Sequence, residues 1–85
     1  MPYPYQVWLR QPCLDNLGTL KAPVRLRLIA CLEALGRDIS MQGDFTICGT
    51  DDRDWQVTIL GTHAIVWWVD HAASEFKIVA IRPAD

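Results

Sequence analysis

Histidine is the side chain best suited to moving a proton near neutral pH, and this chain carries two, His63 and His71. His63 opens a run of β-forming residues, where a general acid or base could be held in place. A histidine in such a strand more commonly makes only a structural hydrogen bond, and His71 lies in a polar stretch where it is expected to be solvated. The two have no paired carboxylate at ligand spacing, so we predict no metal site and no cofactor.

The cysteines Cys13, Cys31 and Cys48 form neither a metal-binding nor a redox motif. They are odd in number, and no two of them have the C-x-x-C spacing. Because no secretory leader precedes them, we expect reduced thiols in a cytoplasmic protein. We interpret them as small, buried apolar side chains.

Three runs of β-forming residues are expected to position the C-terminal part of the chain: Trp55–Leu60, His63–Val69 and Phe76–Ile81. Only Gly61-Thr62 separates the first two runs, and a glycine at the first position of a two-residue link favours a type II′ hairpin. The link 70–74 begins with Asp and ends with Ser, which fits a longer hairpin loop. We therefore predict a three-stranded antiparallel meander.

The hairpin register divides the meander into two faces, because cross-strand partners share a face. One face is entirely apolar and is predicted to lie against the helices: Trp55, Val57, Ile59, Ala64, Val66 and Trp68. The other face mixes polar and aromatic side chains: Gln56, Thr58, His63, Ile65 and Trp67. We predict that this mixed face is a contact surface with Trp67 exposed, unless a helix or the segment 38–49 covers it. A shift of one residue would exchange the two faces.

The first half of the chain indicates a strand and two helices. Tyr5–Arg10 alternates as a strand does, with Trp8 on its polar side, and Pro12–Leu20 has apolar residues at helical spacing, although Gly18 weakens that helix. Pro23–Leu35 carries an apolar stripe and is followed by Gly36, which is expected to end the helix. The stripe consists of Val24, Leu28, Cys31, Leu32 and Leu35.

A further short strand is possible at Asp44–Cys48, before the polar turn 49–53. The predicted order is strand, helix, helix, optional strand, then three strands. This order defines one α+β domain over residues 1–85: a single antiparallel sheet of four or five strands with two helices packed on one face.

Composition bounds the function. The chain has 85 residues, of which 51% are hydrophobic and 21% charged, the balance of one compact domain. Its formal net charge of −2 argues against nucleic acid as the main partner, because such binders usually carry a basic excess. No apolar run approaches the ~20 residues that span a bilayer, so we predict no membrane segment.

The residues from Tyr5 to Leu35 (YQVWLRQPCLDNLGTLKAPVRLRLIACLEAL) resemble the opening of toxins of the RelE/ParE superfamily, in which a strand precedes a helical hairpin. Residues 55–70 (WQVTILGTHAIVWWVD) and 76–85 (FKIVAIRPAD) resemble the terminal meander of that superfamily. The resemblance implies a toxin that pairs with a protein antitoxin. Its ribonuclease branch implies a metal-independent endoribonuclease, in which Lys and Arg, with a Tyr or His, activate a 2′-hydroxyl and stabilise the phosphate.

Most of that basic cluster is missing. The arginine expected in the meander falls on Ala64, and no lysine lies between Lys21 and Lys77. Arg82 is the one position that carries over from the resemblance. Together with His63, which lies on the mixed face of the meander, it forms our candidate catalytic pair. Trp67, Gln56, Thr58 and Arg53 are the candidate binding residues. The missing cations favour binding over catalysis.

Three functions remain open. The first is a toxin-type module that acts by binding a protein, or by contacting the ribosome or RNA. The second is a non-catalytic interaction protein on the same fold, such as an immunity or adaptor protein or a homodimer. The third is a small-molecule-binding α+β domain.

Overall fold

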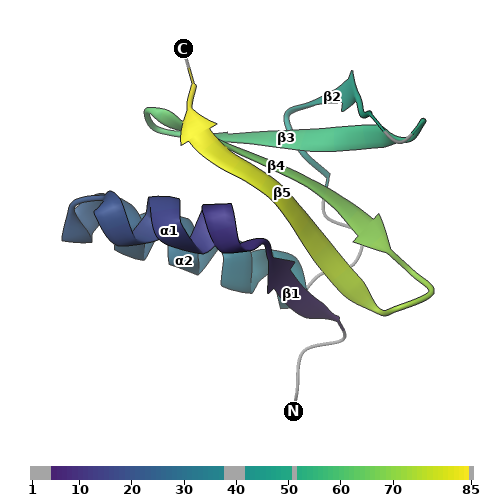
Figure 1. Ribbon diagram of the computed structural model, residues 1–85, viewed down its shortest axis with the longest axis horizontal. Coiled ribbons are helices and arrows are strands. Elements are labelled where there is room, and N and C mark those ends of the chain that lie inside the picture. Colours follow the sequence, from purple (N-terminus) through teal and green to yellow (C-terminus); the bar gives the residue numbers. More distant parts are fainter. Residues whose placement is uncertain (1–4, 38–41, 51, 85) are drawn as a thin grey trace.

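Five strands form one sheet, and two helices cover one of its faces in the computed structural model, which describes residues 5–37, 42–50 and 52–84 (Figure 1). The elements follow one another as β1 (Gln6–Leu9), α1 (Gln11–Thr19), α2 (Ala22–Arg37), β2 (Phe45–Cys48), β3 (Asp54–Leu60), β4 (His63–Asp70) and β5 (Glu75–Pro83). The predicted α+β class and element order are confirmed, and the optional strand is present as β2.

The strand order across the sheet is β1-β5-β4-β3-β2, so the first and last strands of the chain lie side by side. β1 runs parallel to β5, whereas the other neighbouring pairs are antiparallel as predicted. The sheet is therefore mixed. A parallel neighbour needs a long crossover connection, and here α1 and α2 lie in the long connection between β1 and the meander.

The β3–β4 hairpin has the predicted turn. Gly61 has a φ of 63°, the left-handed value that a type II′ turn requires at its first central position. The register pairs Leu60 with His63 and Ile59 with Ala64, as predicted.

The main core lies between the helices and the sheet. From α2 it takes three members of the predicted apolar stripe, Leu28, Leu32 and Leu35, and from α1 it takes Cys13 and Leu17. The sheet contributes Ile65, Trp67, Phe76, Ile78 and Ile81. A second, smaller cluster on the opposite side of the sheet contains Val57, Ala64 and Val66.

The predicted assignment of the two faces is therefore wrong. The mixed face, with Ile65 and Trp67, lies against the helices, and the exposed fraction of Trp67 is 0% rather than that of a contact residue. Two polar groups of this face satisfy each other, because the indole N–H of Trp67 donates a hydrogen bond to Thr58 Oγ1 at 3.0 Å. A tryptophan with such a partner can be buried at little polar cost.

An irregularity in β5 keeps the helix-facing side of this strand continuous. Val66 pairs with Ala80 and Trp67 pairs with Ile78, so Val79 is the extra residue of a bulge. The bulge changes the alternation of side chains, which lets both Ile78 and Ile81 face the main core.

Two smaller expectations need correction. α2 continues through Gly36 to Arg37, and the buried Gly36 accepts a hydrogen bond from the Tyr5 N–H at 3.5 Å instead of ending the helix. The cysteines are unpaired as expected, but only Cys13 is fully buried, and Cys48 is exposed.

Within the described residues, neither helix has the length and apolar character to cross a bilayer.

Candidate functional site

The sheet face away from the helices, called here the open face, carries a row of aromatic and cationic side chains across three strands. Trp8 of β1 and Trp68 of β4 are both in register with Lys77 of β5. Partners in register share a face, so Lys77 lies between two indoles. Its Nζ is 4.6 Å from the centroid of the Trp8 ring, within the range of a cation–π contact.

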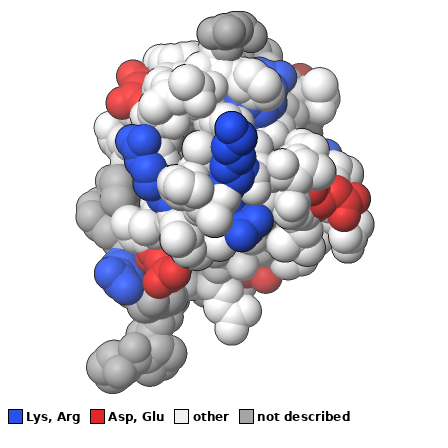
Figure 2. Space-filling model, turned by 90° about the vertical axis from the view of Figure 1, so that its left-hand side faces the viewer, with Lys and Arg blue, Asp and Glu red and all other residues white. Residues whose placement is uncertain are grey.

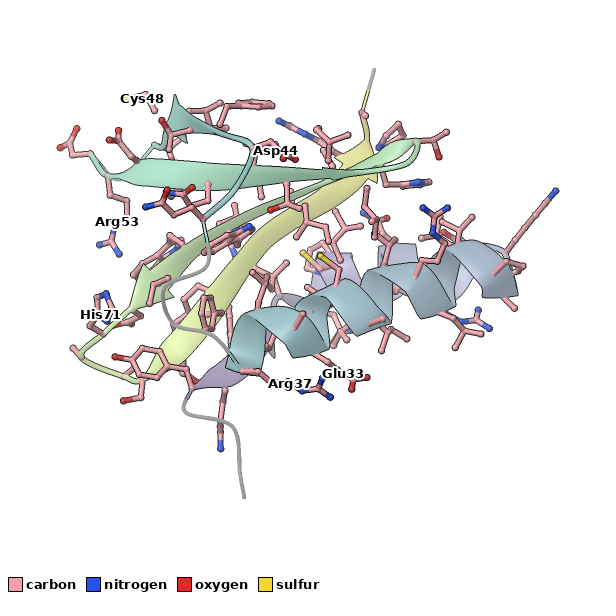
Figure 3. All side chains as sticks on the ribbon, turned by 180° about the vertical axis from the view of Figure 1, so that it is seen from behind. Glu33, Arg37, Asp44, Cys48, Arg53 and His71 are labelled. Atoms are coloured by element: carbon pink, nitrogen blue, oxygen red, sulfur yellow. The ribbon has the colours of Figure 1, made fainter. Side chains whose placement is uncertain are left out.

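Arg53 extends this row at the end of β3. Its guanidinium carbon is 3.8 Å from the centroid of the Trp68 ring. Figure 3 shows Arg53 leaving the end of β3 and pointing toward β4. The exposed Arg53 thus extends the aromatic surface with a cation.

A hollow of about 330 Å³ opens in the middle of this face, lined by Trp8, Arg10, Thr50, Trp55, Trp68, Lys77, Ile78 and Val79. Trp55 is held in place by the turn before it: a β-carbon on Gly49 would lie 2.5 Å from Cε2 of its ring, so only glycine fits there. Among the described residues, no group accepts a hydrogen bond from the buried Nε1 of Trp55. Three tryptophans and two cations, Arg10 and Lys77, are thus among the residues that line the hollow.

Carboxylates balance the cations of the open face. Lys77 Nζ lies 2.8 Å from Glu75 Oε1, which forms an ion pair across the strand surface. Asp52 and Asp54 flank Arg53 along a second, wider hollow of about 500 Å³. A face with this balance lacks the positive excess that attracts a phosphate backbone.

Three of the predicted binding residues, Gln56, Thr58 and Trp67, make internal hydrogen bonds. Gln56 Oε1 accepts one from the Gly43 N–H at 2.8 Å, which fixes the segment that leads into β2. Thr58 accepts the bond from Trp67 described above. Their roles in binding stay predictions.

The predicted catalytic pair lies at one end of the sheet. His63 is opposite Pro83, and Arg82 is opposite Ala64. Side chains alternate along a strand, so His63 points to the helix side and Arg82 to the open face. Both line a pocket of about 220 Å³ between the end of β5 and α1, together with Asn16, Thr19, Leu20, Ile81 and Pro83. The His63 ring has its Nδ1 3.0 Å from Thr62 Oγ1. The catalytic role of the pair stays a prediction.

Sequence reasoning missed the row on the open face. It placed Trp55 and Trp68 against the helices and gave no role to Trp8 or Lys77. One signal was present: Trp8 lies on the polar side of its strand, the side that it shares with Gln6 and Arg10. The parallel pairing that sets Trp8 beside Lys77 joins residues far apart in the chain and leaves no local pattern. Among the described residues, no group of three or more His, Cys, Asp or Glu could hold a metal ion.

Comparison with known proteins shows what this fold resembles. Neither a family model nor a curated protein matches the chain. Solved structures do match. The RelE–RelB complex of the archaeon Pyrococcus horikoshii OT3 aligns with a TM-score of 0.77 and 19% identity, over 94% of this chain and 94% of the other.

Two further structures agree. The toxin–antitoxin complex RelBE2 of Mycobacterium tuberculosis aligns with a TM-score of 0.76 and 14% identity, over 98% of this chain and 99% of the other. A mutant of the Escherichia coli toxin RelE in the free state aligns with a TM-score of 0.74 and 16% identity, over 100% of this chain and 86% of the other. The chain therefore has a RelE-like fold, as its sequence pattern indicated.

Proposed function

We propose that this protein is a toxin-type module of a toxin–antitoxin pair that acts in the cytoplasm by binding a protein through its open face. The fold supports the first part, because the similar structures are RelE toxins and RelE–RelB complexes. The observation that carries the second part is the row of Trp8, Lys77 and Trp68. Tryptophan is enriched where proteins bind one another, and the cation–π contact of Lys77 with Trp8 is a favourable interaction within this surface.

RNA cleavage is the less favoured mode. A metal-independent ribonuclease needs a positioned base and several cations around one phosphate. Two cations of the open face are engaged instead: Lys77 pairs with Glu75, and Arg53 lies over Trp68. The two predicted catalytic side chains point to opposite sides of the sheet.

The test is inducible expression in a bacterial host, with growth and the 5′ ends of cellular RNA measured together. The proposal predicts growth arrest without new RNA ends. Arrest with new ends at defined codons would replace protein binding with ribonuclease activity. Normal growth at a high level of folded protein would overturn the toxin-type function.

A homodimeric interaction protein is the alternative, and one observation favours it. β2 is an edge strand, and the exposed Phe45 on it lies near the exposed Ile59 of β3. An edge strand with apolar neighbours can pair with its copy. Sedimentation equilibrium of the wild type and of Phe45→Ser decides this: a dimer that the substitution dissociates would support the alternative, and a monomeric wild type would remove it.

The small-molecule alternative has less support. Trp67, Phe76 and Leu28 fill the space between helices and sheet, each with an exposed fraction of 1% or less. A ligand there would have to displace the main core.

A further inference from the structure

Half of the eight Lys and Arg residues lie at one end of the molecule, away from the tryptophan row. Lys21 is in the link between the helices, Arg25 and Arg27 are in the first turns of α2, and Arg82 is near the end of β5. Figure 2 views this end directly and shows the basic side chains gathered over it, with acidic side chains toward the margins. We call these four residues the basic end.

The fold brings the four together from distant segments. The tip of the β3–β4 hairpin meets α2, since a β-carbon on Gly61 would lie 3.6 Å from Nη1 of Arg27. Arg25 is held against the helical link, because its Nη1 donates to the Leu20 carbonyl at 3.2 Å. No acidic residue occupies the first turn of α2, so the positive end of the helix dipole adds to the field of the side chains.

One residue of the basic end, Arg82, lines the pocket of about 220 Å³ described above, and so does Leu20, whose carbonyl accepts the hydrogen bond from Arg25. Leu20, Ile81 and Pro83 give the pocket apolar walls. Two of its polar side chains make internal hydrogen bonds: Asn16 Nδ2 donates to the Ile81 carbonyl at 3.1 Å, and Thr19 Oγ1 donates to the Asn16 carbonyl at 2.8 Å. Pockets for drug-sized ligands measure about 300–1,000 Å³, so this smaller one has room for about one amino-acid side chain.

We propose that the basic end binds an acidic segment of a protein partner, which places one apolar side chain in the pocket and its carboxylates on Lys21, Arg25, Arg27 and Arg82. Charge complementarity identifies the segment as acidic. A peptide fits better than RNA because Leu26, with an exposed fraction of 64%, lies between the arginines of α2. The net charge of −2 also weakens any longer contact with phosphates. This inference rests on the proposed function in one respect only: the partner is taken to be a protein.

The test uses the whole chain, labelled with ¹⁵N, and synthetic probes. One probe is a glutamate-rich peptide with a central leucine, the second replaces that leucine with alanine, and the third is single-stranded oligouridylate. Chemical-shift changes at 19–27, 61–63 and 81–82 are expected with the leucine peptide, and weaker binding with the alanine peptide.

Two substitutions on the same helix provide the comparison. Arg27→Gln is expected to weaken binding of the leucine peptide about fivefold, the loss of one surface charge contact. Arg37→Gln removes the same charge at the other end of α2, where Arg37 Nη2 lies 3.7 Å from Glu33 Oε2, and is expected to leave binding unchanged. Both changes are on exposed helix positions, so both variants should fold.

Three results would overturn the inference: shifts elsewhere on the protein, equal effects of the two substitutions, or tighter binding of oligouridylate at the basic end. Trp8→Ala separates the inference from the proposed function. This variant should bind the leucine peptide as tightly as the wild type does, because Trp8 is not part of the basic end. The binding result does not depend on the growth experiment, so either proposal can fail without the other.

Discussion

At the scale of single residues, the hydrogen bond from Trp67 to Thr58 explains why a face of mixed polarity lies in the core. Thr58→Val keeps the side-chain shape but leaves the Trp67 N–H buried without an acceptor. We expect a loss of about 1–3 kcal/mol in the free energy of unfolding, measured by urea denaturation. Thr46→Val, on the exposed edge strand, is the control and should change stability by less than about 0.5 kcal/mol. Equal effects of the two would show that the bond does not stabilise the core.

The thiols provide a second residue-scale prediction. Burial raises the pKa of the Cys13 thiol, and burial together with the Asp44 carboxylate raises the pKa of Cys31. Because only the thiolate is nucleophilic, iodoacetamide at pH 8 should alkylate the exposed Cys48 first and Cys13 only after unfolding. Mass spectrometry of the native and unfolded protein checks the order, and rapid native labelling of Cys13 would contradict its burial.

The same shifts have a pH consequence. A thiol whose folded-state pKa is above its unfolded value, about 8.5, stabilises the fold fully below that value. This contribution is lost as the pH rises, because the unfolded chain then releases the proton first. The free energy of unfolding should therefore fall above about pH 8.5. The Cys13→Ala variant lacks this thiol, so its free energy of unfolding should decrease less between pH 7 and higher pH than that of the wild type does.

At the scale of elements, two glycines should respond to alanine in opposite directions. A β-carbon on Gly18 in α1 would meet nothing within 4 Å, so Gly18→Ala should stabilise the protein by about 0.5–1 kcal/mol through helix propensity. A β-carbon on Gly49 would collide with Trp55, so Gly49→Ala should destabilise it. Thermal unfolding compares the two, and the same sign for both would contradict the contact of Gly49 with Trp55.

The elements were largely predictable from the sequence, and their packing was not. Gly61 at the turn and the alternation of the flanking strands determined the hairpin register, and the apolar stripe of α2 determined its buried side. Local patterns could not show which face of the meander packs against the helices, because both faces are rich in apolar residues. The bulge at Val79 and the internal partner of Trp67 decide it, and both depend on residues brought together by the sheet.

The candidate site was less predictable for the same reason. Alternation put Trp8 on the polar side of its strand, but its contact with Lys77 exists only because β1 pairs in parallel with β5. His63 and Arg82 do meet one pocket, although they point to opposite sides of the sheet.

At the scale of the whole molecule, two surfaces are distinct in chemistry. The open face is aromatic with balanced charges, and the basic end is cationic and adjoins a small pocket that has apolar walls. If one partner contacts both the open face and the basic end, we expect it to pass around one end of the sheet.

The most direct test of the central claim, that the open face binds a protein target, compares two substitutions of equally exposed apolar residues. Trp8 on the open face is 45% exposed and Leu14 on α1 is 48% exposed. Growth is measured after induction of the wild type, Trp8→Ala and Leu14→Ala at equal protein levels. We predict arrest by the wild type and by Leu14→Ala, and growth with Trp8→Ala. Arrest by Trp8→Ala as strong as that of the wild type would contradict the claim.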